Sequence, residues 1–335
     1  MRDIRGAARG RRSPSLLGLL TLASIAAEPA SETPGGVRSL LRSRKWSMGF
    51  TDELKALVDQ VADRVDRWTA QAAWTFEPGS AASAEVTNTE ARLDGTPWGD
   101  RPVRTAYQYA QMTTKLAAEF SRCVALVIEA GRPAPGIETE TRSALEAGSV
   151  AWWLLEPGLT ARQRVCRMQL LRRNSAREFA RSIDELGEDP AVAGTETVAG
   201  VEAECRALGL ASFTRGGDEL EGQVRLRYTK RVQGLTEELG NRDACGIYSG
   251  SAHAELAGIW RLFAQTGATL PSRQPIYSPA ANPEASFSAA DSALKAMMGP
   301  AERIALLFGW TVPGRGDEIS ATIDHMNSAM KRLRP

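Results

Sequence analysis

Three side chains of different chemistry are predicted to lie among apolar or small residues, on their segment or on one face of their helix: Glu146, Arg172 and His253. A carboxylate, a guanidinium and an imidazole that meet can act on a substrate, with the histidine as general base or phosphate contact. Each charge is costly to bury alone, because it loses its hydration. The three residues therefore predict a polar cluster. The sequence leaves open whether this cluster is catalytic or a structural network that fixes the register of helices.

Glu146 is the only charged residue between Ser143 and Leu155, and the apolar positions of this segment surround a helical wheel. The pattern predicts a central buried helix near residues 137–155. Arg172 projects from the middle of an apolar helix face, so it needs an acidic or carbonyl partner. Glu146 is the first choice for that partner, and Glu156 is the second.

The helix predicted from Thr160 to about Gly187 is rich in arginine. At about 100° per residue, five arginines share an arc of about 140°; they are Arg162, Arg167, Arg173, Arg177 and Arg181. This face predicts contact with phosphate or nucleic acid, with Arg162, Arg173 and Arg177 as ligand-binding candidates. The alternatives are a solvated face or pairing with an acidic helix, such as the one that carries Asp52, Glu53, Asp59, Asp63 and Asp66.

The segment from Tyr248 to His253 reads Tyr-Ser-Gly-Ser-Ala-His, and its small residues let a helix or a ligand approach closely. Tyr248 and Ser249 are the ligand-binding candidates beside His253. The chain has no Walker loop, nucleophile elbow or dinucleotide fingerprint. The sequence has only two histidines, and its four cysteines are widely spaced, so we expect no metal site and no cofactor.

The pattern of apolar residues predicts an all-α, multi-helix bundle without convincing strands. The expected helices cover residues 51–68, 103–130, 137–155, 160–187, 197–208, 224–239, 244–263, 285–311 and 318–333. Arg215 to Gly222 is charged and glycine-rich, which predicts a flexible linker between two packed lobes, 48–214 and 223–335.

Residues 1–47 differ from the rest of the chain, with a basic start, a short apolar run and a small polar segment. They predict either a secretory signal or a disordered extension upstream of the true start at Met48. The apolar run is too short to span a membrane. The four cysteines, without C-x-x-C spacing, favour small buried thiols in the cytoplasm, and secretion through the signal-like segment is the alternative.

Two short patterns resemble a group of uncharacterised all-helical proteins of actinobacteria that are distantly similar to the HEPN superfamily. One is Glu146 with Trp152-Trp153-Leu154-Leu155 and Pro157, and the other is the Tyr248–His253 segment. This resemblance implies a helical bundle that binds or cleaves RNA, and it carries over only His253. The arginine that typically precedes the histidine, with four to six residues between them, is absent, since ten residues separate Arg242 from His253.

Two functions are therefore expected from the sequence. The first is HEPN-like binding, or cleavage, of RNA or another phosphate-bearing ligand, with His253, Glu146 and Arg172 as catalytic candidates. The second is a non-catalytic protein-interaction role, with the polar cluster as structure. The net charge of +1 provides no global field for nucleic acid or anionic membranes, so any anion must meet a local patch.

Overall fold

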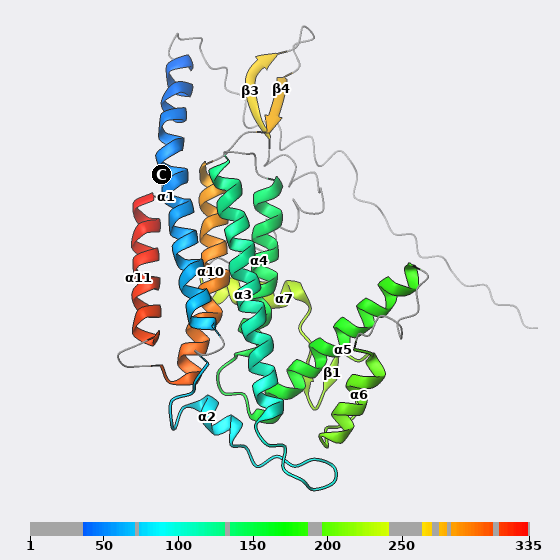
Figure 1. Cartoon of the computed structure of the whole chain (residues 1–335). Helices are drawn as coiled ribbons and strands as arrows, with labels where there is room; N and C mark the ends of the chain where they lie inside the picture. The colour runs from blue at the N-terminus through cyan, green and yellow to red at the C-terminus, as the bar shows by residue number, and fades with distance from the viewer. Residues whose placement is uncertain are drawn as a thin grey trace, which may run out of the picture. The chain divides into compact units, whose positions relative to one another are not determined.

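The computed structural model describes residues 36–70, 74–130, 135–186, 196–240, 263–269, 275–279, 283–310 and 315–333. Within these ranges the chain forms nine helices and two small antiparallel sheets (Figure 1), so the predicted all-α class is confirmed. The helices are α1 (Gly36–Thr69), α2 (Ala81–Val86), α3 (Arg101–Glu129), α4 (Pro135–Leu154), α5 (Ala161–Glu185), α6 (Val198–Ala207), α7 (Tyr228–Glu238), α10 (Pro283–Phe308) and α11 (Arg315–Leu333).

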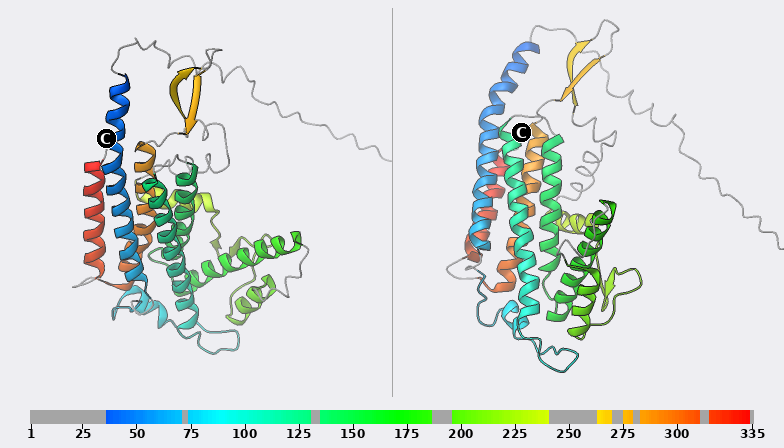
Figure 2. Two further views of the ribbon diagram at one scale, coloured as in Figure 1. Left: turned by 45° about the horizontal axis from the view of Figure 1, so that its top comes forward. Right: turned by 45° about the vertical axis from the view of Figure 1, so that its right-hand side comes forward.

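The chain divides into two compact units, Met1–Trp46 and Ser47–Pro335, and the following concerns the second. Its centre is formed by α3, α4 and α10, which run side by side in every view (Figures 1 and 2). The predicted central helix is present as α4, where Leu145, Ala151 and Leu154 are buried. Gly148 of α4 lies against the backbone of Ala296 in α10, so the absence of a side chain lets these two helices approach closely.

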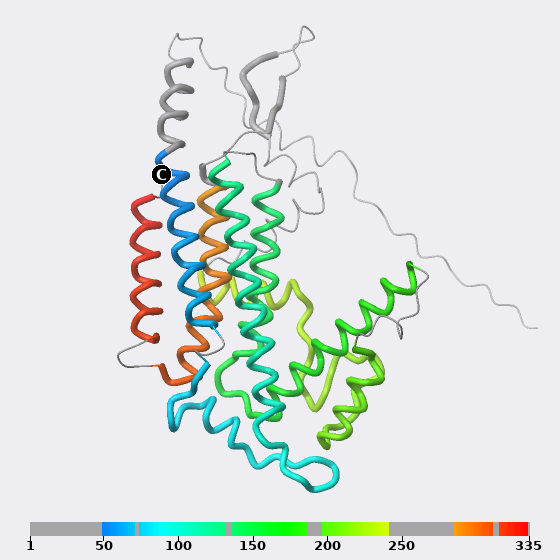
Figure 3. The backbone as a smooth tube through the Cα atoms, in the orientation of Figure 1, coloured from blue at the N-terminus to red at the C-terminus, as the bar shows by residue number. Residues whose placement is uncertain are grey.

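The helix α5 leaves this group at a steep angle and packs against α6 and the first sheet (Figures 1 and 3). It begins at a capping box in which the Thr160 hydroxyl accepts from the backbone of Gln163, and the Gln163 side chain accepts from the backbone of Thr160. This cap was visible in the sequence, and it confirms the predicted start of the helix.

The prediction that the chain lacks strands is wrong at two places. Glu219–Leu220 (β1) pairs with Gln223–Val224 (β2) around a tight turn at Glu221 and Gly222, both with positive φ. Phe263–Thr269 (β3) pairs with Pro275–Pro279 (β4). Strands of two residues are too short to show alternation, and β3 is rich in Ala, Gln and Gly, which do not favour strands.

The segment predicted as a flexible linker is therefore a hairpin. Glu221 in its turn binds Arg162 of α5 at 2.5 Å, which fastens the hairpin to that helix. Ser47–Pro335 forms one compact unit, and the division of this unit into two packed lobes stays a prediction. Charged and glycine-rich composition is typical both of a flexible linker and of a tight turn. The ion pair between Glu221 and Arg162 of α5 identifies this segment as a turn that is fixed to the helix.

Candidate functional site

The structure describes only part of the predicted polar cluster. His253, Tyr248 and Ser249 lie outside the described residues. Glu146 lies on α4 with its side chain 38% exposed, and Arg142 one helical turn earlier donates from Nε to its Oε1 at 2.7 Å. The predicted pair between Glu146 and Arg172 is wrong, because the carboxylate has a partner on its own helix and is half-buried only.

Arg172 has the acidic partners that its burial demands, but both come from around α6. Its guanidinium binds Glu196 and, at 2.8 Å, Glu204, and its Nη1 donates to Gln169. Burial lowers the pKa of Arg172, and hydrogen bonds to Glu196 and Glu204 outweigh that effect, so the net pKa is raised. Glu156, the second predicted partner, binds Arg167 at 2.5 Å instead. Four of the five guanidinium hydrogens of Arg172 have carboxylate or amide acceptors, and the guanidinium also forms a hydrogen bond with Tyr109.

Each arginine of the predicted cationic face also has a carboxylate. Arg162 binds Glu90 and Glu221, Arg173 binds Glu202, and Arg177 and Arg181 contact Glu178. None of these acids comes from the acidic stretch of α1 that was considered as the partner, where Asp63 and Asp66 bind Arg122 instead. The face is largely neutralised by nearby glutamates, which weakens its case as a phosphate surface.

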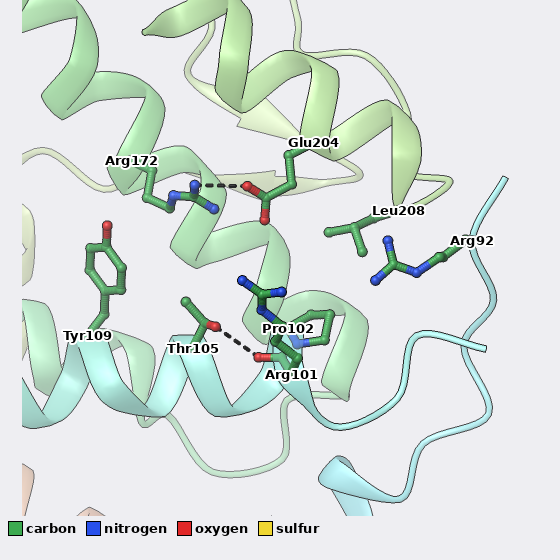
Figure 4. A pocket seen from close by; sticks show the side chains of 8 residues that line it. All are labelled: Arg92, Arg101, Pro102, Thr105, Tyr109, Arg172, Glu204 and Leu208. Atoms are coloured by element: carbon green, nitrogen blue, oxygen red, sulfur yellow. Dashed lines mark hydrogen bonds and ion pairs between the residues drawn. The ribbon is translucent and has the colours of Figure 1, made fainter. Parts of the chain in front are cut away.

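A cleft of about 370 Å³ opens between the first turns of α3, the middle of α5 and the end of α6 (Figure 4). Its lining residues are Arg92, Arg101, Pro102, Thr105, Tyr109, Arg172, Glu204 and Leu208. We call it the arginine cleft. Three guanidiniums point into it from three separate segments, and the Tyr109 hydroxyl is directed toward Arg172.

The loop that carries Arg92 is held by contacts with the end of α6. The backbone of Leu93 donates to Ala207 at 3.3 Å, and Trp98 Nε1 donates to the Leu208 carbonyl at 2.8 Å. Gly209 packs against the same loop with a positive φ, where an added Cβ would lie 3.3 Å from the Ala91 carbonyl. Arg92 is therefore fixed at the cleft although it lies outside any helix.

The three arginines of the arginine cleft differ in their electrostatic state. Arg172 is matched by two carboxylates, whereas the side chains of Arg92 and Arg101 have no ion pair or hydrogen bond within the described part of the chain. Burial raises the pKa of Glu204, and Arg172 outweighs this, so the net pKa is lowered and the carboxylate stays ionised. Burial raises the pKa of Tyr109, which keeps its hydroxyl as a donor.

The sequence from Glu77 to Pro102 is rich in Gly, Pro, Ser and Thr, which is typical of a loop and does not predict these positions. One signal was present: an arginine followed by proline at the start of a long helix places a guanidinium beside free backbone N–H groups. The contact of Arg92 with α6 had no signal, since it depends on how a loop and a distant helix end meet.

The fold and the cleft define an all-α multi-helix protein with a cleft that three arginines line. Comparisons with protein-family models, with curated proteins and with solved structures found no match for the chain. The described helices include none that is long and apolar enough to cross a membrane. Among the described residues, no three His, Cys, Asp or Glu side chains gather as a metal-binding set.

Proposed function

We propose that this protein binds a phosphate-bearing ligand in the arginine cleft. The observation that carries the proposal is the pair of guanidiniums, Arg92 and Arg101, that point into one cavity and form no ion pair within the described part of the chain. Guanidinium groups bind phosphate oxygens through paired, charge-assisted hydrogen bonds. Arg172, held by Glu196 and Glu204, shapes the wall, and Tyr109 lines the same cavity beside it.

The proposal includes RNA as a form of that ligand, in keeping with the HEPN resemblance. An RNA strand and a small phosphorylated molecule both present phosphate oxygens, so either can bind to the guanidiniums of the cleft. In this proposal His253 is the base in cleavage or a contact to the phosphate. The buried, unpaired thiols of Cys166 and Cys205 suit the cytoplasm, where we place the protein.

The test is a titration of the full chain by calorimetry with inorganic pyrophosphate and with a mixed-sequence single-stranded RNA. Arg92→Gln and Arg101→Gln should each weaken binding about tenfold, a loss of about 1.4 kcal/mol. Arg181→Gln is the matched control, because Arg181 is exposed near the far end of α5 and pairs with Glu178. For RNA, the salt dependence of the affinity should fall by about 0.7 in slope for each arginine removed.

Three results would count against the cleft: no binding of either probe, equal binding by all three variants, or a loss confined to Arg181→Gln. If RNA binds, incubation of the wild type and His253→Ala with the same RNA tests cleavage. Loss of cleavage at an unchanged melting temperature assigns His253 to the reaction, whereas a fall in the melting temperature without any RNA cleavage by the wild type assigns it to structure.

A non-catalytic interaction protein is the second candidate, and the outer face of α3 favours it. Met112, Leu116 and Leu126 are 64%, 46% and 57% exposed. On the helix they fall within an arc of about 80°. Apolar side chains that gather on one exposed face are typical of a protein contact. If the folded wild type binds neither phosphate probe, this function takes precedence.

A further inference from the structure

A second cavity, of about 210 Å³, lies against the first turns of α3. It shares no lining residue with the arginine cleft. The residues of α3 that line the cleft (Arg101, Thr105 and Tyr109) and those that line the second cavity project from different sides of the helix. We call the second cavity the aromatic pocket; it is lined by Trp74, Phe76, Arg104, Tyr107, Gln108 and Gln111.

The aromatic walls are held in place from behind. Phe308 lies edge-on to Trp74, Phe76 and Tyr107, with ring centroids 5.0, 5.0 and 5.1 Å away. The Tyr107 hydroxyl donates to Glu85 at 3.0 Å, so that ring is also fixed at its far end. Aromatic side chains held in this way form a preformed surface for another ring, because none has to move to meet it.

Polar groups accompany these rings. The Gln111 amide nitrogen donates to the Thr69 carbonyl, which leaves its carbonyl oxygen as an acceptor, and Gln108 is exposed. Trp74 Nε1 is shielded from solvent and has no acceptor among the described residues. A shielded nitrogen is out of reach of a ligand, so the polar contacts of this pocket come from Gln108 and Gln111.

Arg104 supplies the charge. Its guanidinium lies over the Phe76 ring at 4.8 Å, and its Nε donates to Asp100 at 2.5 Å. Both groups of this ion pair are about half exposed, so the pair contributes little and leaves the terminal nitrogens of Arg104 available. Stacking on Phe76 orients the guanidinium before any ligand arrives.

We propose that the aromatic pocket binds a single planar aromatic ring that carries a carboxylate or a phosphate. An apolar cavity of about 150 Å³ accepts benzene, so this volume accommodates one ring with a substituent. The ring packs against Trp74, Phe76 and Tyr107, and its anionic group meets Arg104. The proposal is independent of the arginine cleft, because the two sites use different residues.

The test uses four probes with the full chain: benzoate, phenyl phosphate, benzyl alcohol and inorganic phosphate. Calorimetry or ligand-observed NMR gives the affinity. Benzoate or phenyl phosphate should bind, and Arg104→Gln should weaken that binding about tenfold while benzyl alcohol is unaffected. The preferred acid identifies the anionic group. Arg101→Gln is the matched control, since it removes an exposed arginine of α3 that lines only the arginine cleft.

Melting temperatures accompany each variant. If Arg104→Gln lowers the melting temperature, Gln108→Glu replaces it, because this exposed change places a negative charge at the pocket and should repel the same acids without disturbing the core. The proposal is overturned if neither aromatic acid binds, or if both bind Arg104→Gln or Gln108→Glu as tightly as wild type. Equal loss in Arg101→Gln would place the ligand in the arginine cleft instead.

Discussion

Arg164 illustrates what a buried charge requires at the scale of one residue. Its side chain is fully buried, and its Nε and Nη2 bind the two oxygens of Glu85 at 2.6 and 2.7 Å. Nη1 donates to the Leu154 carbonyl, Nη2 also donates to the Glu156 carbonyl, and the guanidinium lies 5.1 Å from the Tyr107 ring. An arginine cannot shed its proton, so every face of it has to be paired. This network ties α2, α3 and α5 together.

Replacing only Arg164 or only Glu85 should therefore destabilise the fold far more than replacing both. Arg164→Met leaves the Glu85 carboxylate buried without a cation and should cost about 3–5 kcal/mol in the free energy of unfolding. Arg164→Met with Glu85→Leu should recover most of that loss, except about 1 kcal/mol for the Tyr107 hydroxyl that loses its acceptor. Urea unfolding of Arg164→Met, Glu85→Leu and the double variant measures the loss in each single variant and its recovery in the double variant. A double variant that is as unstable as the sum of the singles would contradict it.

At the scale of elements, the sequence located helices well and their partners poorly. The start of α5 was predictable because its capping box is local. The acids that pair with Arg172 were not, since Glu196 and Glu204 are placed by the packing of α6 and give no periodic signal of their own. The arginine cleft was missed for the same reason, because Arg92 reaches it through a loop. Local chemistry is visible in a sequence, and contacts between elements are not.

The close contact between α4 and α10 depends on the absence of a side chain at Gly148. A Cβ on Gly148 would lie 2.2 Å from the Ala296 carbonyl oxygen, so Gly148→Ala must push the two helices apart. We expect a loss of about 1–3 kcal/mol in the free energy of unfolding.

Gly136→Ala is the matched control, on the same helix, where the new Cβ would lie 3.7 Å from Val127 in ordinary contact. It should be neutral, or stabilising by up to about 1 kcal/mol, because alanine favours a helix. Thermal melting of both variants checks the pair. Equal melting temperatures would show that α4 and α10 are not in close contact.

At the scale of the whole molecule, acidic and basic residues are nearly equal in number, and many of them form local ion pairs. Arginines of α5 meet glutamates of α6 and of the first hairpin, and the lowered pKa values of Asp218 and Glu221 arise first from hydrogen bonds to Arg225 and Arg162. Such pairs stabilise the folded state only while the carboxylates are ionised. The fold should therefore be sensitive to acid.

The direction in which stability changes with pH follows from those pKa values. Because the pKa of Glu221 is lower in the folded chain than its ordinary 4.5, the unfolded state takes up a proton first as the pH falls. The stability from this group is complete above about pH 5 and is lost below the ordinary pKa, as the pH falls through the folded value. Urea unfolding at pH 7 and about pH 3.5 should show a smaller pH dependence in Glu221→Gln than in wild type. Glu53→Gln, at an exposed position of α1, should retain the full dependence.

The ion pairs of α5 also bear on the order in which the chain folds. Arg162 and Glu221 are 59 residues apart, whereas Arg303 of α10 donates to the Trp152 carbonyl of α4 across 151 residues. Contacts that are close in sequence form sooner, because less chain entropy is lost in closing them. As the protein emerges from the ribosome, α5, α6 and the first hairpin can thus assemble while α4 still awaits α10. Until α10 arrives, the face of α4 that packs against α10 stays uncovered, and that interval is when the nascent chain is most exposed to aggregation.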